Sequence, residues 1–148
     1  MISEAKRLEK LEKAVEELIE RSDAEPVIVE GKRDVQAMRE IGVEGIVKPV
    51  NTGIGIINFC EALSSEYDSF IILTDWDRKG GQIAHHLEIG FESVDVKYDT
   101  QIRALFAMLT KKDIKDVESL PSYLERLRKS VLTKAPNDPR NHERRGKD

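Results

Sequence analysis

Short apolar segments alternate along this chain with longer segments in which apolar and charged residues recur at helical spacing. The apolar runs at 27–30 and 69–74 are of strand length and rich in Val and Ile, which is typical of parallel strands buried on both faces. Strands that alternate with helices favour an α/β fold with one parallel sheet and right-handed crossovers. Further strands are predicted at 46–50 and 93–98, and helices at 33–41, 55–66, 79–89, 100–111 and 121–131.

An amphipathic helix of about twenty residues is predicted at the N-terminus, with Ser3 as its cap and an apolar stripe that includes Leu11 and Leu18. Gly90 is predicted to end the 79–89 helix, because glycine readily adopts the left-handed conformation that follows many helices. The N-terminal helix is interpreted as a cover for the core or as a dimerisation element.

The length of 148 residues fits one domain with additional terminal segments. Residues 129–148 carry six Lys or Arg and three Asp or Glu, so the rest of the chain has a net charge of −7, against −4 for the whole. An acidic body repels phosphate backbones unless metal ions or a local basic patch reverse the field. The charge therefore argues against a simple nucleic-acid-binding protein but not against a metal-dependent one.

Several classes of protein are excluded by what the chain contains. Its single Cys60 excludes an internal disulfide and a Cys-based zinc site. The first residues have no apolar secretory core, and no apolar stretch approaches the ~18 residues of a membrane span. We therefore expect a soluble, cytoplasmic protein without a membrane partner.

Three carboxylates follow the two most apolar strands. Glu30 ends the first, and Asp75 and Asp77 follow the second at a spacing that places both side chains on one side of an extended segment. Ligand chemistry in open parallel sheets gathers beyond the carboxyl ends of the strands. If these acids share a hard divalent cation, the two strands must be neighbours, which selects the strand order 2-1-3-4.

Around these acids the sequence resembles a known family. The apolar run that ends in Glu30-Gly31 with Asp34 close behind, and the second run that ends in Asp75-x-Asp77 with Gly80, resemble the two motifs of the Toprim domain of topoisomerases, bacterial primases and certain small nucleases. The resemblance covers about 26–98 and is nearest in style to small stand-alone prokaryotic Toprim proteins and to the ribonuclease that matures 5S ribosomal RNA.

The resemblance implies a three-layer α/β/α Rossmann-like fold with a four-stranded parallel sheet and flanking terminal helices. The expected organisation is an N-terminal helix over 1–22, a Toprim core over 26–98, C-terminal helices packed on the core over 99–132, and a basic, disordered tail over 133–148. The resemblance also implies that Asp75 and Asp77 hold one or two Mg²⁺ ions, for which Mn²⁺ can substitute. Glu30 would act as a general acid and base or as a further metal ligand.

Other residues near the acids are candidates for contact with phosphate groups: Gly31, Lys32, Arg33, Arg78, Lys79 and Gly80. For each cation, simple solvation of a loop is an equally good interpretation. Gly53 and Gly55 open a predicted helix and are more often a tight turn than a phosphate site. Trp76 is expected to face away from the aspartates, and Glu118 is a weaker candidate to reach them.

The favoured function is a Mg²⁺-dependent enzyme, a nuclease acting on phosphodiester bonds of RNA or DNA, with a homodimer or a larger assembly as its expected state. The alternative is a non-catalytic metal- and nucleic-acid-binding subunit. A phosphatase of the haloacid dehalogenase type, which also uses Asp-x-Asp, is a remote alternative because Lys79 stands where that type has a small or β-branched residue. A self-sufficient topoisomerase or primase is excluded, since Tyr67, Tyr98 and Tyr123 are interpreted as packing residues and the chain is too short for template-binding modules.

Overall fold

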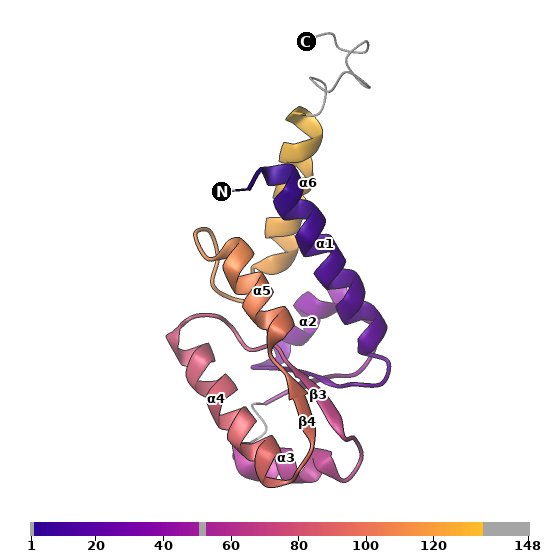
Figure 1. Ribbon diagram of the computed structural model, residues 1–148, viewed down its shortest axis with the longest axis vertical. Coiled ribbons are helices and arrows are strands. Elements are labelled where there is room, and N and C mark those ends of the chain that lie inside the picture. The colour runs from indigo at the N-terminus through magenta and orange to yellow at the C-terminus, as the bar shows by residue number, and fades with distance from the viewer. Residues whose placement is uncertain (1, 51–52, 135–148) are drawn as a thin grey trace.

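The computed structural model describes residues 2–50 and 53–134, which form a parallel sheet covered by helices on both faces (Figure 1). This is the three-layer α/β architecture that the alternation of strands and helices predicts. In chain order the elements are α1 (Glu4–Arg21), β1 (Val27–Val29), α2 (Lys32–Glu40), β2 (Val47–Pro49), α3 (Ile56–Ser64), β3 (Ser69–Ile72), α4 (Arg78–Ser93), β4 (Lys97–Asp99), α5 (Gln101–Thr110) and α6 (Leu120–Lys134).

The strand order is β2-β1-β3-β4, and every neighbouring pair is parallel. Val27 of β1 lies opposite Val47 of β2 on one side and Ile71 of β3 on the other. The chain therefore builds the sheet outward from β1 in one direction and then returns to add β3 on its other side. The order 2-1-3-4 that the acidic residues required is confirmed, and the carboxyl ends of β1 and β3 are neighbours.

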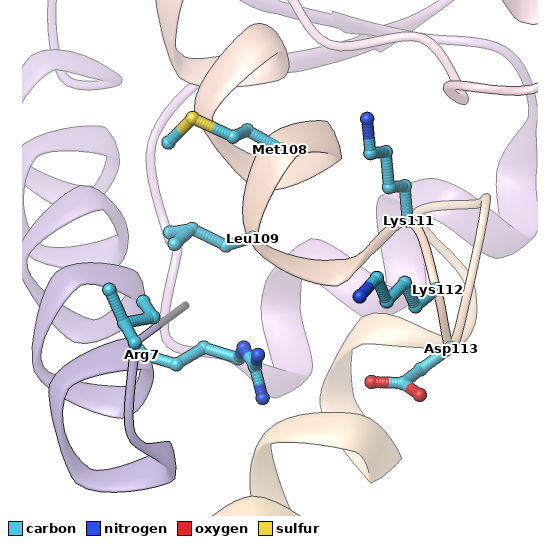
Figure 2. A pocket seen from close by; sticks show the side chains of 7 residues that line it. Arg7, Met108, Leu109, Lys111, Lys112 and Asp113 are labelled. Carbon is cyan, nitrogen blue, oxygen red and sulfur yellow. The ribbon is translucent and has the colours of Figure 1, made fainter.

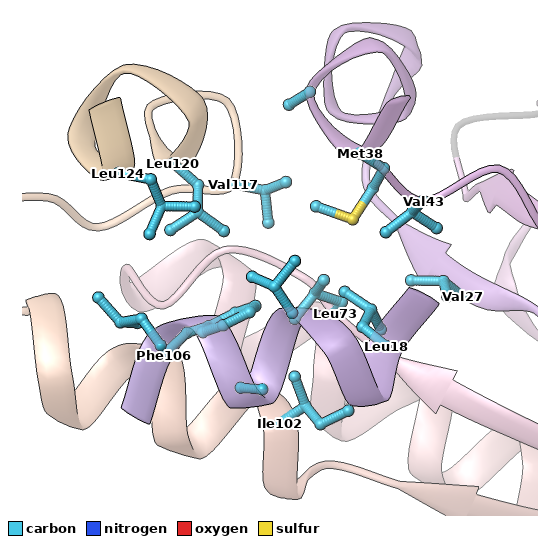
Figure 3. Packing of buried hydrophobic residues seen from close by; sticks show 14 of the residues in the cluster. Leu18, Val27, Met38, Val43, Leu73, Ile102, Phe106, Val117, Leu120 and Leu124 are labelled. Atoms are coloured by element: carbon cyan, nitrogen blue, oxygen red, sulfur yellow. The ribbon is translucent and has the colours of Figure 1, made fainter. Parts of the chain in front are cut away.

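Both faces of the central strands are buried, because successive residues point to opposite sides. Val27, Val29 and Leu73 belong to the larger core, which packs against α1, α2, α5 and α6 (Figure 3). Ile28 and Ile72 belong to a second core beneath α3 and α4. This double burial explains why both strands are almost continuous apolar runs in the sequence.

Helix α1 begins at the predicted cap, where the Ser3 side chain accepts a 3.1 Å hydrogen bond from the Lys6 amide. Its apolar stripe, with Leu11 and Leu18 fully buried, packs against α5 and α6. Helices α1 and α6 run side by side and extend away from the sheet (Figure 1). The helix is therefore a cover for the larger core.

One predicted boundary is wrong. Helix α4 does not end before Gly90 but continues to Ser93, and β4 begins at Lys97 instead of 93. A Cβ atom at Gly90 would lie 2.6 Å from the Cys60 sulfur of α3. Gly90 therefore permits the close packing of α3 on α4 and is not a helix cap, and the apolar Phe91 after it still belongs to the helix.

The C-terminal helix is also longer than predicted, since α6 reaches Lys134 and includes the first two residues of the expected tail. The remainder of that tail, 135–148, lies outside the described residues. The division of the chain into a Toprim core and terminal segments stays a prediction. Within residues 2–50 and 53–134, none of the helices combines the length and apolar character needed to cross a bilayer.

Candidate metal centre

Three carboxylates converge at the carboxyl edge of the sheet. Glu30 follows β1 directly, and Asp75 and Asp77 lie in the segment between β3 and α4. One oxygen of each carboxylate lies within 4.8 Å of the others. Because β1 and β3 are parallel neighbours, the two apolar runs that are far apart in the sequence end at the same place.

Backbone amides orient all three side chains. Glu30 Oε2 accepts a 2.9 Å hydrogen bond from the Asp75 amide, and Asp75 Oδ1 accepts one of 2.9 Å from the Val117 amide. Asp77 Oδ1 accepts a 2.7 Å hydrogen bond from the Gly80 amide and so caps α4. Each carboxylate thus uses one oxygen to fix its position, which leaves the other oxygen for a ligand.

The cluster carries negative charge in a partly desolvated place. Burial raises the pKa of Asp75 to about 7, and the charges of Glu30, Asp34 and Asp116 act in the same direction. Burial also raises the pKa of Glu30, which Asp77 and Asp34 raise further. A bound cation would stabilise the ionised forms, because an opposite charge at short range favours them.

The donor set fits a hard divalent cation. Mg²⁺ prefers oxygen ligands and commonly binds one or two carboxylates, with water and substrate phosphate as the other ligands. Glu30, Asp75 and Asp77 offer such oxygens from one edge of the sheet. They could hold one ion or share two adjacent ions.

Arg103 binds the backbone of the segment that carries Asp75, and it was not identified as a site residue from the sequence. Its guanidinium, on α5, donates to the Thr74 carbonyl oxygen at 3.1 Å and to the Asp75 carbonyl oxygen at 3.2 and 2.7 Å. Burial lowers the pKa of Arg103, while the acids Glu30 and Asp75 oppose that effect. In the sequence, Arg103 is simply a cation next to Ile102 in a largely apolar helix. That local context does not predict a contact with the distant segment that carries Asp75.

The segment between α5 and α6 closes over the turn that carries the aspartates. The Trp76 amide donates to the Lys115 carbonyl and its indole Nε1 donates to the Ile114 carbonyl, each at 2.9 Å. Its ring packs near Phe106, with centroids 6.2 Å apart. Trp76 therefore joins the larger core instead of turning to the acids, as expected from its position between them.

Two glycines predicted to face phosphate behave differently. At Gly31 no atom lies within 4 Å of where a Cβ would be, and Asp34 accepts a 3.1 Å hydrogen bond from the Gly31 amide. At Gly80 a Cβ would lie 2.0 Å from the Asp75 carbonyl oxygen. The space beside Gly31 is open, whereas Gly80 is required because the start of α4 packs on the Asp75 backbone.

A groove of about 740 Å³ is lined by Glu30 and Asp75, whereas the exposed Asp77 is not among its lining residues. Of the predicted phosphate contacts it brings together Gly31, Lys32, Arg33 and Lys79, whereas Arg78 and Gly80 are not among its lining residues. Glu118 also lines the groove, where it lies 3.7 Å from Arg33 as an exposed ion pair. Glu118 therefore lies at the groove, but it is not one of the carboxylates that cluster within 4.8 Å, and its contact with the acids stays a prediction.

A second cavity, of about 610 Å³, lies between α1 and the end of α5 (Figure 2). Its lining combines the apolar Met108 and Leu109 with the cations Arg7, Lys111 and Lys112. Asp113 is the one carboxylate among its described lining residues, and it accepts a hydrogen bond from Tyr123. This cavity lacks the donors for a divalent cation, so the groove over Glu30 and Asp75 is the candidate site.

Comparisons with known proteins agree with this geometry. The model of the Toprim domain matches residues 25–109. A UPF0292 protein of Methanosarcina barkeri is 40% identical over 124 residues, which cover 83% of this chain and 86% of that protein. A UPF0292 protein of Methanosarcina acetivorans is 42% identical over 124 residues, which cover 83% of this chain and 85% of that protein. A UPF0292 protein of Methanocaldococcus jannaschii is 37% identical and is covered over 92% of its length.

A solved structure, a putative protein from Aquifex aeolicus, superposes with a TM-score of 0.64 at 24% identity, over 74% of this chain and 96% of the other. That likeness shows the fold alone. A Toprim domain implies a metal-binding, nucleic-acid-related function, and the acidic cluster of Glu30, Asp75 and Asp77 has the composition that metal binding requires. By the match of the family model and by these relatives, the chain belongs to the Toprim domain family.

Proposed function

We propose that this Toprim protein is a nuclease that hydrolyses phosphodiester bonds of nucleic acid with Mg²⁺, or Mn²⁺ in its place. The observation that carries the proposal is the convergence of Glu30, Asp75 and Asp77 from two neighbouring strand ends to within 4.8 Å. A carboxylate cluster of this size can bind one or two hydrated ions. When bound, such ions neutralise charge on the phosphate and on the attacking and leaving oxygens.

The protein's own groups would divide the remaining work. Asp75 and Asp77 would hold the metal through the oxygens that accept no backbone hydrogen bond. Glu30 has a second oxygen, Oε1, that could take a proton from the attacking water and return it to the leaving oxygen of the nucleic acid. The raised pKa of Glu30 suits this role, because an acid and base works best when its pKa approaches the working pH.

The cations that line the groove would bind the phosphates on either side of the scissile bond. Lys32 and Arg33 begin α2, and Lys79 lies in the first turn of α4, so they flank the acids from two helices. Their placement supplies the local basic patch that an acidic body needs in order to bind a polyanion. The N-terminal ends of α2 and α4, beside these cations, carry partial positive charge that favours anions as well.

The test compares cleavage of labelled structured RNA, duplex DNA and single-stranded DNA in Mg²⁺ and in EDTA. We expect the wild type to cleave at least one of these substrates in Mg²⁺, and Asp75→Ala to cleave none. Asp23→Ala, an exposed aspartate before the amino end of β1, is the matched control and should retain full activity. Cleavage in EDTA, or full cleavage by Asp75→Ala, would contradict the proposal. Metal-dependent binding without cleavage would instead favour a subunit that supplies its metal site to a larger assembly.

A further inference from the structure

The groove lined by Glu30 and Asp75 has two unlike sides. Helix α2 and the start of α6 lie on one face of the sheet, and from that side Lys32, Arg33 and Glu118 line the groove. Helices α3 and α4 lie on the other face, and from that side the lining combines Lys79, at the start of α4, with an apolar wall. This apolar wall consists of Val50, Ile56 and Ile83.

The apolar wall is held in place from beneath. Its three side chains are partly buried and pack against the core under α3 and α4. The Val50 amide also donates a 2.8 Å hydrogen bond to the Val29 carbonyl. This bond links the wall to β1, the strand that directly precedes Glu30. The wall therefore keeps a fixed position relative to the acids, as a binding surface should.

Open space lies next to the wall. Gly53 and Gly55 also line the groove, and no atom lies within 4 Å of where a Cβ would be at either residue. Their φ angles of 83° and 86° lie in the region that side-chain-bearing residues rarely adopt. The chain thus uses glycine at two positions where any side chain would enter the groove or strain the backbone.

We propose that the apolar wall binds the face of an unpaired nucleobase while the neighbouring phosphate lies at Glu30, Asp75 and Asp77. The substrate class would then be single-stranded nucleic acid, or a strand end whose last bases have separated. This inference rests on the proposed function and adds to it the strandedness of the substrate. It assigns a role to Val50, Ile56 and Ile83, which the chemistry of phosphate cleavage leaves without one.

The chemistry of the groove selects this ligand. Phosphates and sugars are polar and gain nothing from an aliphatic surface, whereas the face of a base is apolar and is the part that proteins bind in single strands. In a duplex that face is covered by the neighbouring base pairs, so it cannot reach the wall. A groove of about 740 Å³ lies within the ~300–1,000 Å³ range of sites for small ligands. The side chains of the apolar wall have no groups that hydrogen-bond to the edge of a base, so we expect the protein to show little preference for nucleotide sequence.

The test measures binding in Mg²⁺ with an oligonucleotide whose phosphodiester linkages are replaced by ones that resist hydrolysis, which separates binding from catalysis. The short oligonucleotide carries 2-aminopurine, a fluorescent base that brightens when it leaves the base stack, and it is presented as a single strand or as a blunt duplex. We expect the single strand to bind more tightly and its 2-aminopurine to brighten. In Ile56→Ser and Ile83→Ser the affinity for the single strand should fall by about fourfold or more, since each change removes three carbon atoms and each methylene lost from an apolar contact costs about fourfold.

Matched controls exist on the same two helices. Ile57 of α3 and Ile89 of α4 are 50% and 45% exposed and are not among the residues that line the groove. Ile57→Ser and Ile89→Ser should bind the single strand as the wild type does. An abasic nucleotide in place of the 2-aminopurine should bind to the wild type and to Ile56→Ser equally. Thermal unfolding of all four variants identifies any that fail to fold, and Val50→Thr, which keeps the shape of the side chain, is a third wall variant that should also bind the single strand more weakly.

The outcomes distinguish this inference from the proposed function. Equal affinity for duplex and single strand, with wall variants that bind like the controls, would overturn the inference even if the protein cleaves nucleic acid. If the single strand binds as expected but is not cleaved in Mg²⁺, the nuclease proposal is overturned. The assignment of the apolar wall to the binding of a base would then remain. Absence of any nucleic-acid binding in Mg²⁺ would overturn both.

Discussion

The amide of Asp75 donates a 2.9 Å hydrogen bond to the carboxylate of Glu30, although the two residues are 45 positions apart in the chain. This bond joins the ends of β1 and β3 directly at the site. It fixes the Glu30 carboxylate through one oxygen, Oε2, at the edge of the groove that Glu30 lines. The carboxylate that we assign to proton transfer is therefore oriented by the residue that we assign to metal binding.

The first prediction concerns the metal. Asp75→Ala and Asp77→Ala each remove an anionic ligand, so calorimetric titration should show Mg²⁺ and Mn²⁺ affinities reduced by about tenfold or more. Asp23→Ala should bind both ions as the wild type does. Unchanged affinity in both Asp75→Ala and Asp77→Ala would remove these residues from the metal site.

A second prediction separates two roles for Glu30. In Glu30→Gln the amide oxygen can still accept the hydrogen bond from Asp75, but the side chain can no longer take up a proton. If Glu30 moves protons, turnover in single-turnover assays should fall by about 10²–10⁴-fold while metal and nucleic-acid binding persist. If Glu30 is chiefly a ligand, metal binding should weaken and added Mg²⁺ should partly restore activity. Cleavage at the wild-type rate would exclude Glu30 from the mechanism.

The pH dependence of stability provides a third test. Burial holds the pKa of Asp75 at about 7 in the folded protein, above its ordinary value of 3.8. Between these values the folded state binds a proton that the unfolded state has released, so this contribution to the free energy of unfolding is lost as the pH rises through the window. Metal-free wild type should therefore lose thermal stability relative to Asp75→Asn between about pH 4 and about pH 8.

Metal binding should show the opposite trend. Because Asp75 must be ionised to bind a cation, Mg²⁺ affinity should increase as the pH rises through about 7. Thermal unfolding with and without saturating Mg²⁺ measures both effects in one series. A difference between wild type and Asp75→Asn that does not vary with pH would show that Asp75 is already ionised at low pH.

A fourth prediction uses two adjacent glycines. At Gly80 an added Cβ would lie 2.0 Å from the Asp75 carbonyl oxygen, whereas at Gly81 the nearest atom is Arg103 Nη2 at 3.7 Å. Gly80→Ala should lower the free energy of unfolding by about 1–3 kcal/mol and weaken metal binding, because the Asp75 backbone must move. Gly81→Ala should be neutral or stabilising by up to about 1 kcal/mol, since alanine favours a helix. Urea unfolding of both variants checks this, and equal effects would contradict the close approach at Gly80.

The sequence by itself determined the features that depend on neighbouring residues. The buried strands could be identified because 27–29 and 70–73 are continuous apolar runs, and the Ser3 cap because its partner lies three residues away. The acids were identifiable because Glu30 follows β1 directly and Asp75 and Asp77 lie in the short segment after β3. Even the order of strands followed once one ion was assumed to bind both Glu30 and Asp75, since only neighbouring strands bring their ends together.

The tertiary structure alone decided what depends on segments that are distant in the chain. Gly90 has the local appearance of a helix end, yet its role depends on the Cys60 side chain of another helix. The contacts of Arg103 with the Asp75 carbonyl and of the Val117 amide with the Asp75 carboxylate span 28 and 42 positions. The apolar wall beside the acids likewise arises from side chains whose spacing in the chain carries no common period. Such contacts form only when the folded sheet places the helices side by side, so no local pattern of residues predicts them.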